Sequence, residues 1–343
     1  MDNLYIRVDG NDIIATGHVM RCITIAQQLN KIGINTIFIL ADSYPAVIIK
    51  KYGFDFAILD SVWNNLDLEI DKICNFIKEN KIRKLLIDSY YVTESYLESI
   101  SKLTNIIYID DIKKFKYPVN TIIHYNIFVE TEKYRSQIEK DGSINFLLGG
   151  MYAPLREEFS YQEYRVRDNV NKILITTGGT DKYNVAGNLL DFFGEKAELK
   201  NIEFHVVSGV FNTNKNYLKK IADKNNNIFL YENINNMSDL MRMCDVAISA
   251  SGTTLYELCA CGIPTICFTI ADNQKGAEKW QDSGLMFYAG NVEENMSDCI
   301  NKCYVDLKKY MSDKKIRMNN SKKMQSVIDG YGAQRIAEYI KEM

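Results

Sequence analysis

The chain opens with LYIRVDGN at residues 4–11 and continues with GHVMR at residues 17–21. The first part holds the apolar run Leu4–Val8, which has the length and composition of a short buried strand. The second part begins a stretch, Gly17–Lys31, in which apolar residues recur every third position, as in an amphipathic helix. A strand, a turn and a helix in this order predict a parallel α/β sheet.

The same order recurs along the whole chain. Further strands are expected at residues 36–40, 56–59, 84–87, 105–109, 172–176, 203–207, 228–230, 246–248 and 265–268, with helical stretches between most of them. A polar stretch at residues 161–171 separates the two series. We therefore expect an N-terminal domain at residues 1–155, a C-terminal domain at residues 172–330 and a closing helix at residues 331–343. Two doubly wound, Rossmann-like domains facing a central cleft are the predicted architecture, with ligands beyond the carboxyl ends of the strands.

Composition excludes several classes of protein. The formal net charge of −3 gives no electrostatic footprint for nucleic acid or for an anionic membrane. No apolar run approaches the ~18 residues of a spanning helix, and no signal peptide precedes the first strand, so we expect a cytoplasmic protein. The eight cysteines are scattered and lack the paired ligands of a zinc site. We expect no metal site and no cofactor, and the oligomeric state is not predicted.

His18 is the predicted catalytic residue. It falls in the first turn of the first expected helix, where the positive helix end disfavours an imidazolium. A neutral imidazole at the edge of a cleft is a good general base for water. We expect Asp9 to orient His18 through its other ring nitrogen, Gly17 to permit a tight backbone before it, and Arg21 to contact the substrate.

The other two histidines are expected to be structural. His205 falls inside the expected strand 203–207, and His124 ends a strand-like run at residues 121–124. Nearby Asn126 is counted among the substrate-binding residues. The residues Asp88-Ser89-Tyr90 and Asp110-Asp111 also end strands and are expected to line the same cleft, and Tyr90 is counted among the substrate-binding residues.

Two small-residue turns in the second half are suited to a diphosphate. The first, TTGGTD at residues 176–181, offers Gly178, Gly179 and Thr180, although it is neither G-x-G-x-x-G nor a P-loop. The second, SASGTTLYE at residues 249–257, offers backbone N–H groups and hydroxyls at Ser251, Gly252 and Thr253 before an expected helix.

Three polar side chains are expected to bind the rest of the substrate. Glu257 lies one helical turn beyond the second small-residue turn, where its carboxylate can accept both ribose hydroxyls. Asn273 and Gln274 follow the strand 265–268, and their amides are suited to sugar hydroxyls or an acetamido group. A loop or helix-cap role explains these two amides nearly as well.

In this order, the motifs resemble those of the UDP-2,4-diacetamido-2,4,6-trideoxy-β-L-altropyranose hydrolases of pseudaminic acid biosynthesis. The resemblance runs over nearly the whole chain and is most specific in GHVMR at residues 17–21. One departure is Ala15, where a glycine is expected. The family is similar to the GT-B glycosyltransferases, which implies a GT-B-like fold. Some relatives carry a fused acetyltransferase, and none is expected here.

The resemblance implies a small-molecule UDP-sugar substrate, held mainly by the second domain, and a water activated by His18. The expected reaction is metal-independent, inverting hydrolysis of the anomeric C–O bond. UDP is a good leaving group, so the paired carboxylates of a glycosidase are not required. Two alternatives stay open: a GT-B glycosyltransferase, in which the histidine activates an acceptor hydroxyl, and a non-catalytic sugar-nucleotide-binding protein. The exact sugar and the choice of uracil are not readable from the residues.

Overall fold

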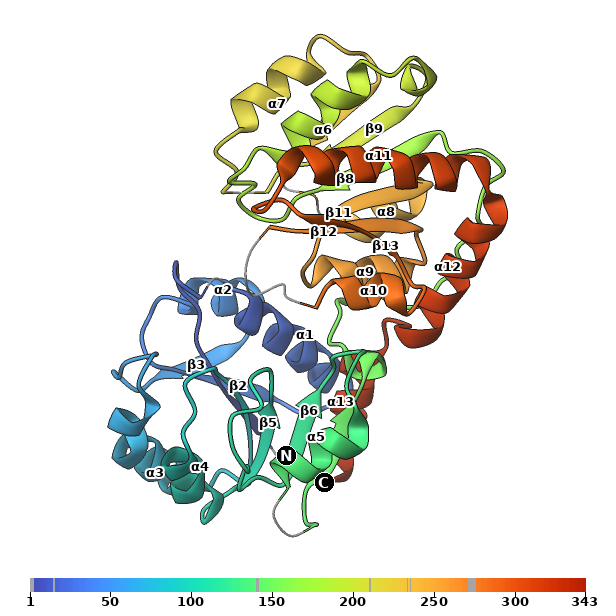
Figure 1. The fold of residues 1–343 in the computed structure, drawn as a ribbon. Coiled ribbons are helices and arrows are strands. Elements are labelled where there is room, and N and C mark those ends of the chain that lie inside the picture. The colour runs from blue at the N-terminus through green and yellow to red at the C-terminus, as the bar shows by residue number, and fades with distance from the viewer. Residues whose placement is uncertain are drawn as a thin grey trace. The chain divides into compact units, whose positions relative to one another are not determined.

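The computed structural model describes residues 3–14, 16–139, 142–209, 211–232, 234, 236–270 and 276–343. The chain divides into two compact units (Figure 1). Unit 1 comprises Met1–Glu157 and Gly330–Met343, and unit 2 comprises Glu158–Asp329. Each unit is built on one parallel sheet, so the predicted α/β class with two Rossmann-like domains is confirmed.

Unit 1 contains a seven-stranded sheet in the order β3-β2-β1-β4-β5-β6-β7. The strands are β1 Leu4–Val8, β2 Thr36–Leu40, β3 Asp55–Ile58, β4 Lys84–Asp88, β5 Asn105–Ile109, β6 Thr121–His124 and β7 Asn145–Leu148. The helices are α1 Gly17–Lys31, α2 Ala46–Lys51, α3 Ile70–Glu79, α4 Glu94–Ser101, α5 Thr131–Ile138 and α13 Gly332–Glu342. Short 3₁₀ turns occur at Leu66–Glu69, Gly150–Tyr152 and, where the two units join, Glu157–Phe159.

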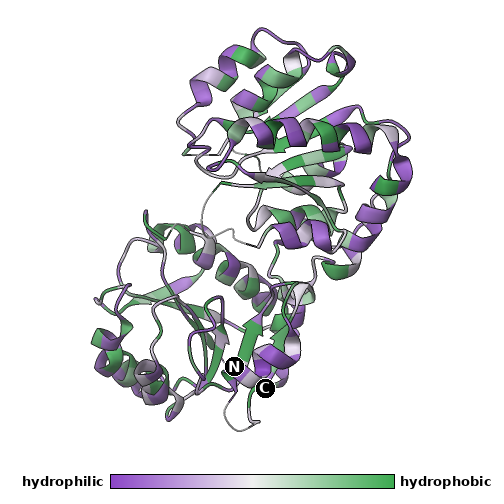
Figure 2. Cartoon of the chain, in the orientation of Figure 1, coloured by the Kyte–Doolittle hydropathy of each residue, from purple (hydrophilic) through white to green (hydrophobic). Residues whose placement is uncertain are grey.

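The interior strand β1 explains why helices cover both faces of this sheet. Successive side chains of a strand point to opposite faces. Leu4 and Ile6 accordingly join a core cluster with residues of α1 and α13, whereas Tyr5 joins a second cluster with residues of α3 and α4. All five residues of β1 are buried. Figure 2 shows the strands as the most apolar parts of the chain, with mixed hydropathy along the helices.

Unit 2 contains a six-stranded sheet in the order β10-β9-β8-β11-β12-β13. The strands are β8 Lys172–Thr176, β9 Glu203–Val207, β10 Ile228–Tyr231, β11 Val246–Ala250, β12 Thr265–Thr269 and β13 Phe287–Asn291. The helices are α6 Val185–Gly194, α7 Lys215–Ala222, α8 Met237–Met243, α9 Thr254–Cys261, α10 Glu278–Asp282, α11 Met296–Ser312 and α12 Lys314–Val327, with a 3₁₀ turn at Ala197–Leu199.

The last helix, α13, returns to unit 1 after the chain has completed unit 2. Its first residue is Gly332, where a Cβ would lie 2.1 Å from the carbonyl oxygen of Ala153. Only glycine allows this close approach of two backbone segments. The helix then contributes Ile336 and Ile340 to the core beside α1. Residues from both ends of the chain therefore form one hydrophobic core.

Most of the predicted elements are found at or within a few residues of their expected positions. The third strand lies one residue earlier than expected, at Asp55–Ile58. Strands β7 and β13 were not predicted. Their sequences, NFLL and FYAGN, contain aromatic residues but no β-branched residue, and each includes an asparagine, which is depleted in strands, so the strand signal is weak.

Candidate active site

Each sheet has a point at which its strand order reverses. In unit 1 the chain runs outward from β1 to β3 and then returns to add β4 on the other side of β1. In unit 2 the same reversal places β8 beside β11. Open α/β sheets bind ligands beyond the carboxyl ends of the strands at such points. The loops after β1 and β4, and those after β8 and β11, are therefore the candidate binding loops.

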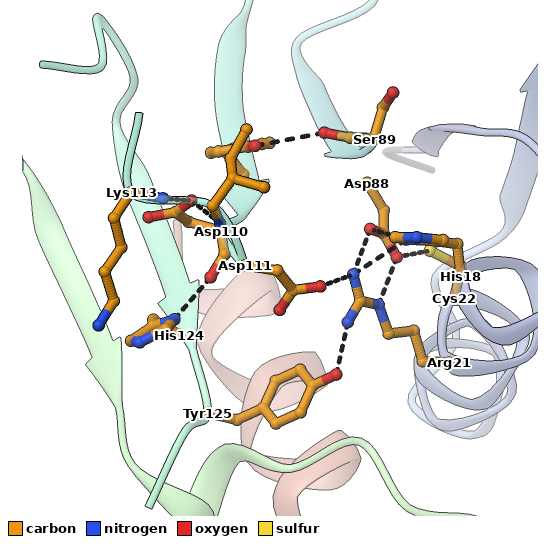
Figure 3. Close-up of polar contacts among 12 residues, drawn as sticks. His18, Arg21, Cys22, Asp88, Ser89, Asp110, Asp111, Lys113, His124 and Tyr125 are labelled. Atoms are coloured by element: carbon orange, nitrogen blue, oxygen red, sulfur yellow. Dashed lines mark hydrogen bonds and ion pairs between the residues drawn. The ribbon is translucent and has the colours of Figure 1, made fainter. Parts of the chain in front are cut away.

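The site in unit 1 is centred on His18 and Asp88 (Figure 3). His18 is the second residue of α1, and Asp88 is the last residue of β4, paired with Val8 of β1. The His18 Nδ1 atom lies 2.6 Å from Asp88 Oδ1. Both side chains are buried, with 6% and 1% of their surfaces exposed. The predicted histidine thus lies at the reversal point, with a carboxylate on one ring nitrogen.

The charge on Asp88 fixes which nitrogen of His18 carries the proton. Burial alone would raise the pKa of Asp88, but Arg21 and His18 hold that pKa well below its ordinary value. An ionised carboxylate can only accept hydrogen bonds, so His18 Nδ1 donates to Asp88 at 2.6 Å, and the longer approach of Arg21 Nη2 to the same nitrogen, at 3.0 Å, is then a contact between two donors. In a neutral imidazole the lone pair is then on Nε2, to which none of the described residues hydrogen-bonds. Nε2 is the atom available as a base.

Arg21 holds this carboxylate in place. Its Nε donates to Asp88 Oδ2 at 2.6 Å, and its Nη2 donates to Asp88 Oδ1 at 2.5 Å. Nη2 also donates to Asp111 Oδ2 at 2.7 Å, and Nη1 donates to the Tyr125 hydroxyl at 2.5 Å. The guanidinium therefore ties α1 to residues at or just after the ends of β4, β5 and β6, as Figure 3 shows. These contacts are to the protein, and the substrate contact expected of Arg21 stays a prediction.

Two other predicted residues of unit 1 flank the pair. The rings of Tyr90 and His18 are in edge-to-face contact, with centroids 4.4 Å apart, and Tyr90 is 44% exposed. Burial and the nearby carboxylate of Asp111 raise the pKa of the Tyr90 phenol. Asn126 is exposed, and its side-chain oxygen accepts a hydrogen bond from the Phe128 N–H at 2.8 Å. Both side chains stay candidates for substrate contact.

The structure corrects two predictions about the residues that support His18. Asp9 does not contact the imidazole, because one carboxylate oxygen accepts from Arg7 at 2.5 Å and the other from the Ala41 N–H at 2.8 Å. The orienting carboxylate is Asp88. The backbone does not require a glycine at position 17 either, since its φ lies outside the left-handed region and a Cβ there would meet nothing within 4 Å; the substrate contact expected of Gly17 stays a prediction.

Asp9 belongs instead to a buried ion-pair network under the end of β1. Arg7 is fully buried and donates two hydrogen bonds of 2.8 Å to the Glu69 carboxylate. The Tyr96 hydroxyl donates to the same carboxylate at 2.9 Å. Since each charge has a partner, burial is tolerated. The network joins β1 to the segment before α3 and fixes the strand end from which the loop to His18 leaves.

The first candidate loop of unit 2 follows β8. Gly178, Gly179 and Thr180 are exposed, and Gly178 has a φ of 79°, in the left-handed region that favours glycine. Asp181 ends the turn by accepting the N–H groups of Val185 at 2.7 Å and Ala186 at 3.2 Å. These bonds cap α6. The predicted small-residue turn is therefore presented on the surface and anchored by a helix cap.

The second candidate loop follows β11 and leads into α9. Gly252 and Thr253 are exposed, whereas Ser251 is 4% exposed. Thr253 precedes α9 and forms no side-chain cap, whereas the N–H groups of Leu255 and Tyr256 donate to the carbonyl oxygens of Gly252 at 3.1 Å and Thr253 at 3.0 Å. Glu257 lies in the first turn of α9 and is half-buried. This arrangement is suited to an anion, and the individual contacts expected of these residues stay predictions.

Asn273 and Gln274 lie outside the described residues. Four other side chains belong to the site: Asp88 and Asp111, which are expected to line the cleft but have no predicted role, and Cys22 and Tyr125, which are not predicted. Asp88 and Asp111 carried a usable signal, because each stands at or just after the end of an expected strand. The sequence gives no sign that Tyr125 and Cys22 contact this cluster.

Among the residues that the structure describes, no three or more His, Cys, Asp or Glu side chains form a group that could hold a metal ion. No helix in the described part of the chain is long and apolar enough to cross a membrane. The expected independence from metal stays a prediction.

Sequence comparison finds relatives among nucleotide-sugar enzymes. A family model of group 1 glycosyl transferases matches residues 171–306. An uncharacterized protein of Methanocaldococcus jannaschii is 28% identical over 271 residues, which cover 75% of this chain and 54% of that protein. A Helicobacter pylori protein is 28% identical over 260 residues, which cover 75% of this chain and 42% of that protein. The chain thus spans about half the length of these two relatives.

Two relatives have names that describe the same activity. The Helicobacter pylori protein is named as a pseudaminic acid cytidylyltransferase and UDP-2,4-diacetamido-2,4,6-trideoxy-β-L-altropyranose hydrolase. A Campylobacter jejuni protein is named as the same hydrolase alone. It is 25% identical over 283 residues, which cover 80% of this chain and 94% of that protein.

Solved structures share the fold at low sequence identity. MurG of Acinetobacter baumannii superposes with a TM-score of 0.72 at 12% identity, covering 100% of both chains. The UDP-GlcNAc 2-epimerase of Neisseria meningitidis has a TM-score of 0.62 at 14% identity, covering 100% of this chain and 99% of the epimerase. The glycosyltransferase SnogD of Streptomyces nogalater has a TM-score of 0.60 at 12% identity, covering 99% of both chains.

Because an epimerase and a glycosyltransferase share this fold, the fold by itself does not select a reaction. The names of two sequence relatives describe a reaction, which the fold alone does not indicate. The resemblance predicted from the motifs is confirmed: the chain has the GT-B fold and is related to the UDP-2,4-diacetamido-2,4,6-trideoxy-β-L-altropyranose hydrolases.

Proposed function

We propose that this chain is a nucleotide-sugar enzyme that hydrolyses a UDP-linked 2,4-diacetamido-2,4,6-trideoxy sugar. The reaction cleaves the anomeric C–O bond and releases UDP and the free sugar for pseudaminic acid biosynthesis. The observation that carries the proposal is the His18–Asp88 pair, which leaves His18 Nε2 as a base at the reversal point of unit 1. The names of the two hydrolase relatives support the choice of substrate.

The pair supplies what hydrolysis of a UDP-sugar requires. His18 Nε2 takes a proton from water while the water oxygen forms a bond to C1, with inversion at that carbon. The C1–O bond to UDP breaks, and its electron pair leaves on the diphosphate. Asp88 accepts the Nδ1–H throughout and stabilises the imidazolium that forms. A leaving group as good as UDP needs no carboxylic acid to protonate it.

Unit 2 is proposed to bind UDP. The exposed residues Gly252 and Thr253 at the start of α9 and the exposed turn at Gly178 and Gly179 are proposed to offer backbone donors for the diphosphate. Glu257, in the first turn of α9, is proposed to accept the ribose hydroxyls. On this proposal, the free energy of UDP binding comes mainly from backbone groups that the fold already holds in place.

A glycosyltransferase is the second candidate, favoured by the match of group 1 glycosyl transferases to residues 171–306. An NMR time course with the UDP-linked sugar and no acceptor separates the two. The hydrolase predicts release of UDP and of free sugar, with the inverted anomer formed first. If UDP appears only when an acceptor sugar is added, the chain is a transferase. GDP- and CDP-linked versions of the sugar test the choice of nucleotide in the same assay.

A further inference from the structure

Strands β5 and β6 end in the same pattern. At the end of each strand a buried residue is followed by one that contacts Arg21. Asp110 is fully buried and precedes Asp111, and His124 is 3% exposed and precedes Tyr125. The two buried residues contact each other, because His124 Nδ1 lies 2.5 Å from the carbonyl oxygen of Asp110. Figure 3 shows this contact on the side of Asp111 away from Arg21.

Hydrogen bonds fix both the main chain and the side chain of Asp110. One carboxylate oxygen accepts the N–H groups of Ile112 at 2.9 Å and Lys113 at 3.0 Å, and also the Tyr117 hydroxyl at 3.0 Å. The other oxygen accepts the Tyr134 hydroxyl at 2.5 Å. The N–H of Asp110 donates to the carbonyl oxygen of Ile123 on β6 at 3.0 Å. These hydrogen bonds fix the conformation of the turn after β5, and with it the position of Asp111.

His124 forms the contact with the Asp110 carbonyl oxygen, and its own side chain is tightly packed. The Tyr134 ring stacks on the imidazole with centroids 4.6 Å apart and planes 12° apart. A carbonyl oxygen can only accept, so Nδ1 is the donor to Asp110. Nε2 is buried and has no hydrogen-bond partner among the described residues. Burial lowers the pKa of His124 although its bond to Asp110 opposes the shift, so the ring is neutral.

We propose that Asp110 and His124 are positioning residues for the reaction. They fix the turn that carries Asp111 and the strand end that carries Tyr125, and these two residues hold Arg21 against Asp88. Asp88 in turn sets the tautomer of His18. This inference rests on the proposed function for its kinetic consequences, whereas the contacts that carry it are independent of the substrate.

The test compares His124→Leu with His124→Asn in the UDP-release assay. The leucine removes the donor to Asp110, so kcat is expected to fall about 10- to 100-fold, the order of loss for a catalytic group displaced by about 1 Å. KM is expected to change less than kcat. In His124→Asn the amide nitrogen can replace Nδ1 as donor, so most of the lost kcat is expected to return.

His205→Leu in unit 2 is the matched control. His205 is also 3% exposed and stacked on an aromatic ring, Phe229, at 12° between planes, but the residues that it contacts belong to unit 2 and do not include Arg21. The kcat of His205→Leu is expected to stay within about twofold of wild type. If His124→Leu and His205→Leu have the same kcat, the positioning role is refuted. If His124→Leu does not fold, the Tyr134→Phe variant is measured instead. Its kcat is expected to fall, and an unchanged kcat would refute the positioning role.

A second measurement does not depend on turnover. The chain has three histidines, so the imidazole ¹⁵N signals of His18 can be assigned by substitution. The proposal predicts an Nδ1–H tautomer in wild type and a mixture of tautomers in the His124→Leu or Tyr134→Phe variant. An unchanged His18 tautomer would overturn it. A wild-type protein that releases no UDP would refute the proposed function and leave this spectroscopic test to decide the positioning role.

Discussion

Asp88, rather than Asp9, is the carboxylate on His18, and its replacement by an amide tests the role assigned to it. Asp88→Asn keeps the shape but removes the charge that requires Nδ1 to donate. The amide can donate to Nδ1 and so favour a proton on Nε2, which removes the base. We expect kcat to fall about 10²- to 10⁴-fold, with a small change in KM. A kcat within about threefold of wild type would contradict the assigned role.

Asp9→Asn is expected to lower the stability of the protein and to leave kcat nearly unchanged, the opposite of Asp88→Asn. Asp9 contacts Arg7 and the Ala41 N–H inside the buried network, and it does not contact His18. Removing a charge from a buried pair costs about 3 kcal/mol, so urea denaturation is expected to give a lower free energy of unfolding. The kcat of the folded protein is expected to change only a few-fold. A large loss of kcat at full stability would restore Asp9 as the partner of His18.

Asp88 also predicts a pH dependence of stability. Its pKa is lowered in the folded chain, and returns to its ordinary value of about 4 on unfolding. The folded state therefore binds fewer protons, and the stabilisation is complete above about pH 5 and is lost as the pH falls toward the folded pKa. The free energy of unfolding of Asp88→Asn is expected to fall less steeply below pH 5. Parallel slopes for the two proteins would contradict the lowered pKa.

At the scale of elements, the loop after β9 supports the turn after β8. A Cβ at Gly209 would lie 2.4 Å from the Gly179 carbonyl oxygen and 2.5 Å from that of Gly178. Gly209→Ala must therefore displace the Gly178-Gly179 turn. If this turn binds the diphosphate, the affinity for UDP measured by calorimetry is expected to fall about tenfold.

Gly194→Ala is the control in the same unit. Gly194 ends α6, and a Cβ there meets nothing within 4 Å. Its affinity for UDP is expected to match wild type, and its stability is expected to rise slightly, because alanine is the better helix former. Equal UDP affinity in the two alanine variants would exclude the turn from the binding site.

Local patterns predicted the first strand and the first helix to the residue, and with them His18. The period of apolar residues and the polar turns are local properties, so the strand–turn–helix units could be read from the sequence. The order of strands in a sheet depends on packing between distant segments. His18 and Asp88 are 70 residues apart in sequence. A doubly wound order places β4 beside β1, but which carboxylate contacts His18 depends on side-chain packing, and the nearer Asp9 is the partner that the sequence predicts.

For the whole molecule, catalysis is proposed without a metal ion, with the donors for the diphosphate coming from the ends of β8 and β11. The chain is then expected to retain its UDP-release activity within about twofold after treatment with EDTA, because backbone N–H groups at a helix end can stabilise the leaving diphosphate. Loss of activity on chelation and its recovery with Mg²⁺ would contradict this account of the leaving group.

The central claim is that His18 performs the chemistry while other parts of the chain bind the nucleotide. The most direct test measures turnover and UDP affinity together in His18→Ala. We predict that kcat falls about 10²- to 10⁴-fold, while the dissociation constant for UDP stays within about threefold of wild type. Turnover that persists within a few-fold of wild type in this variant would contradict the claim.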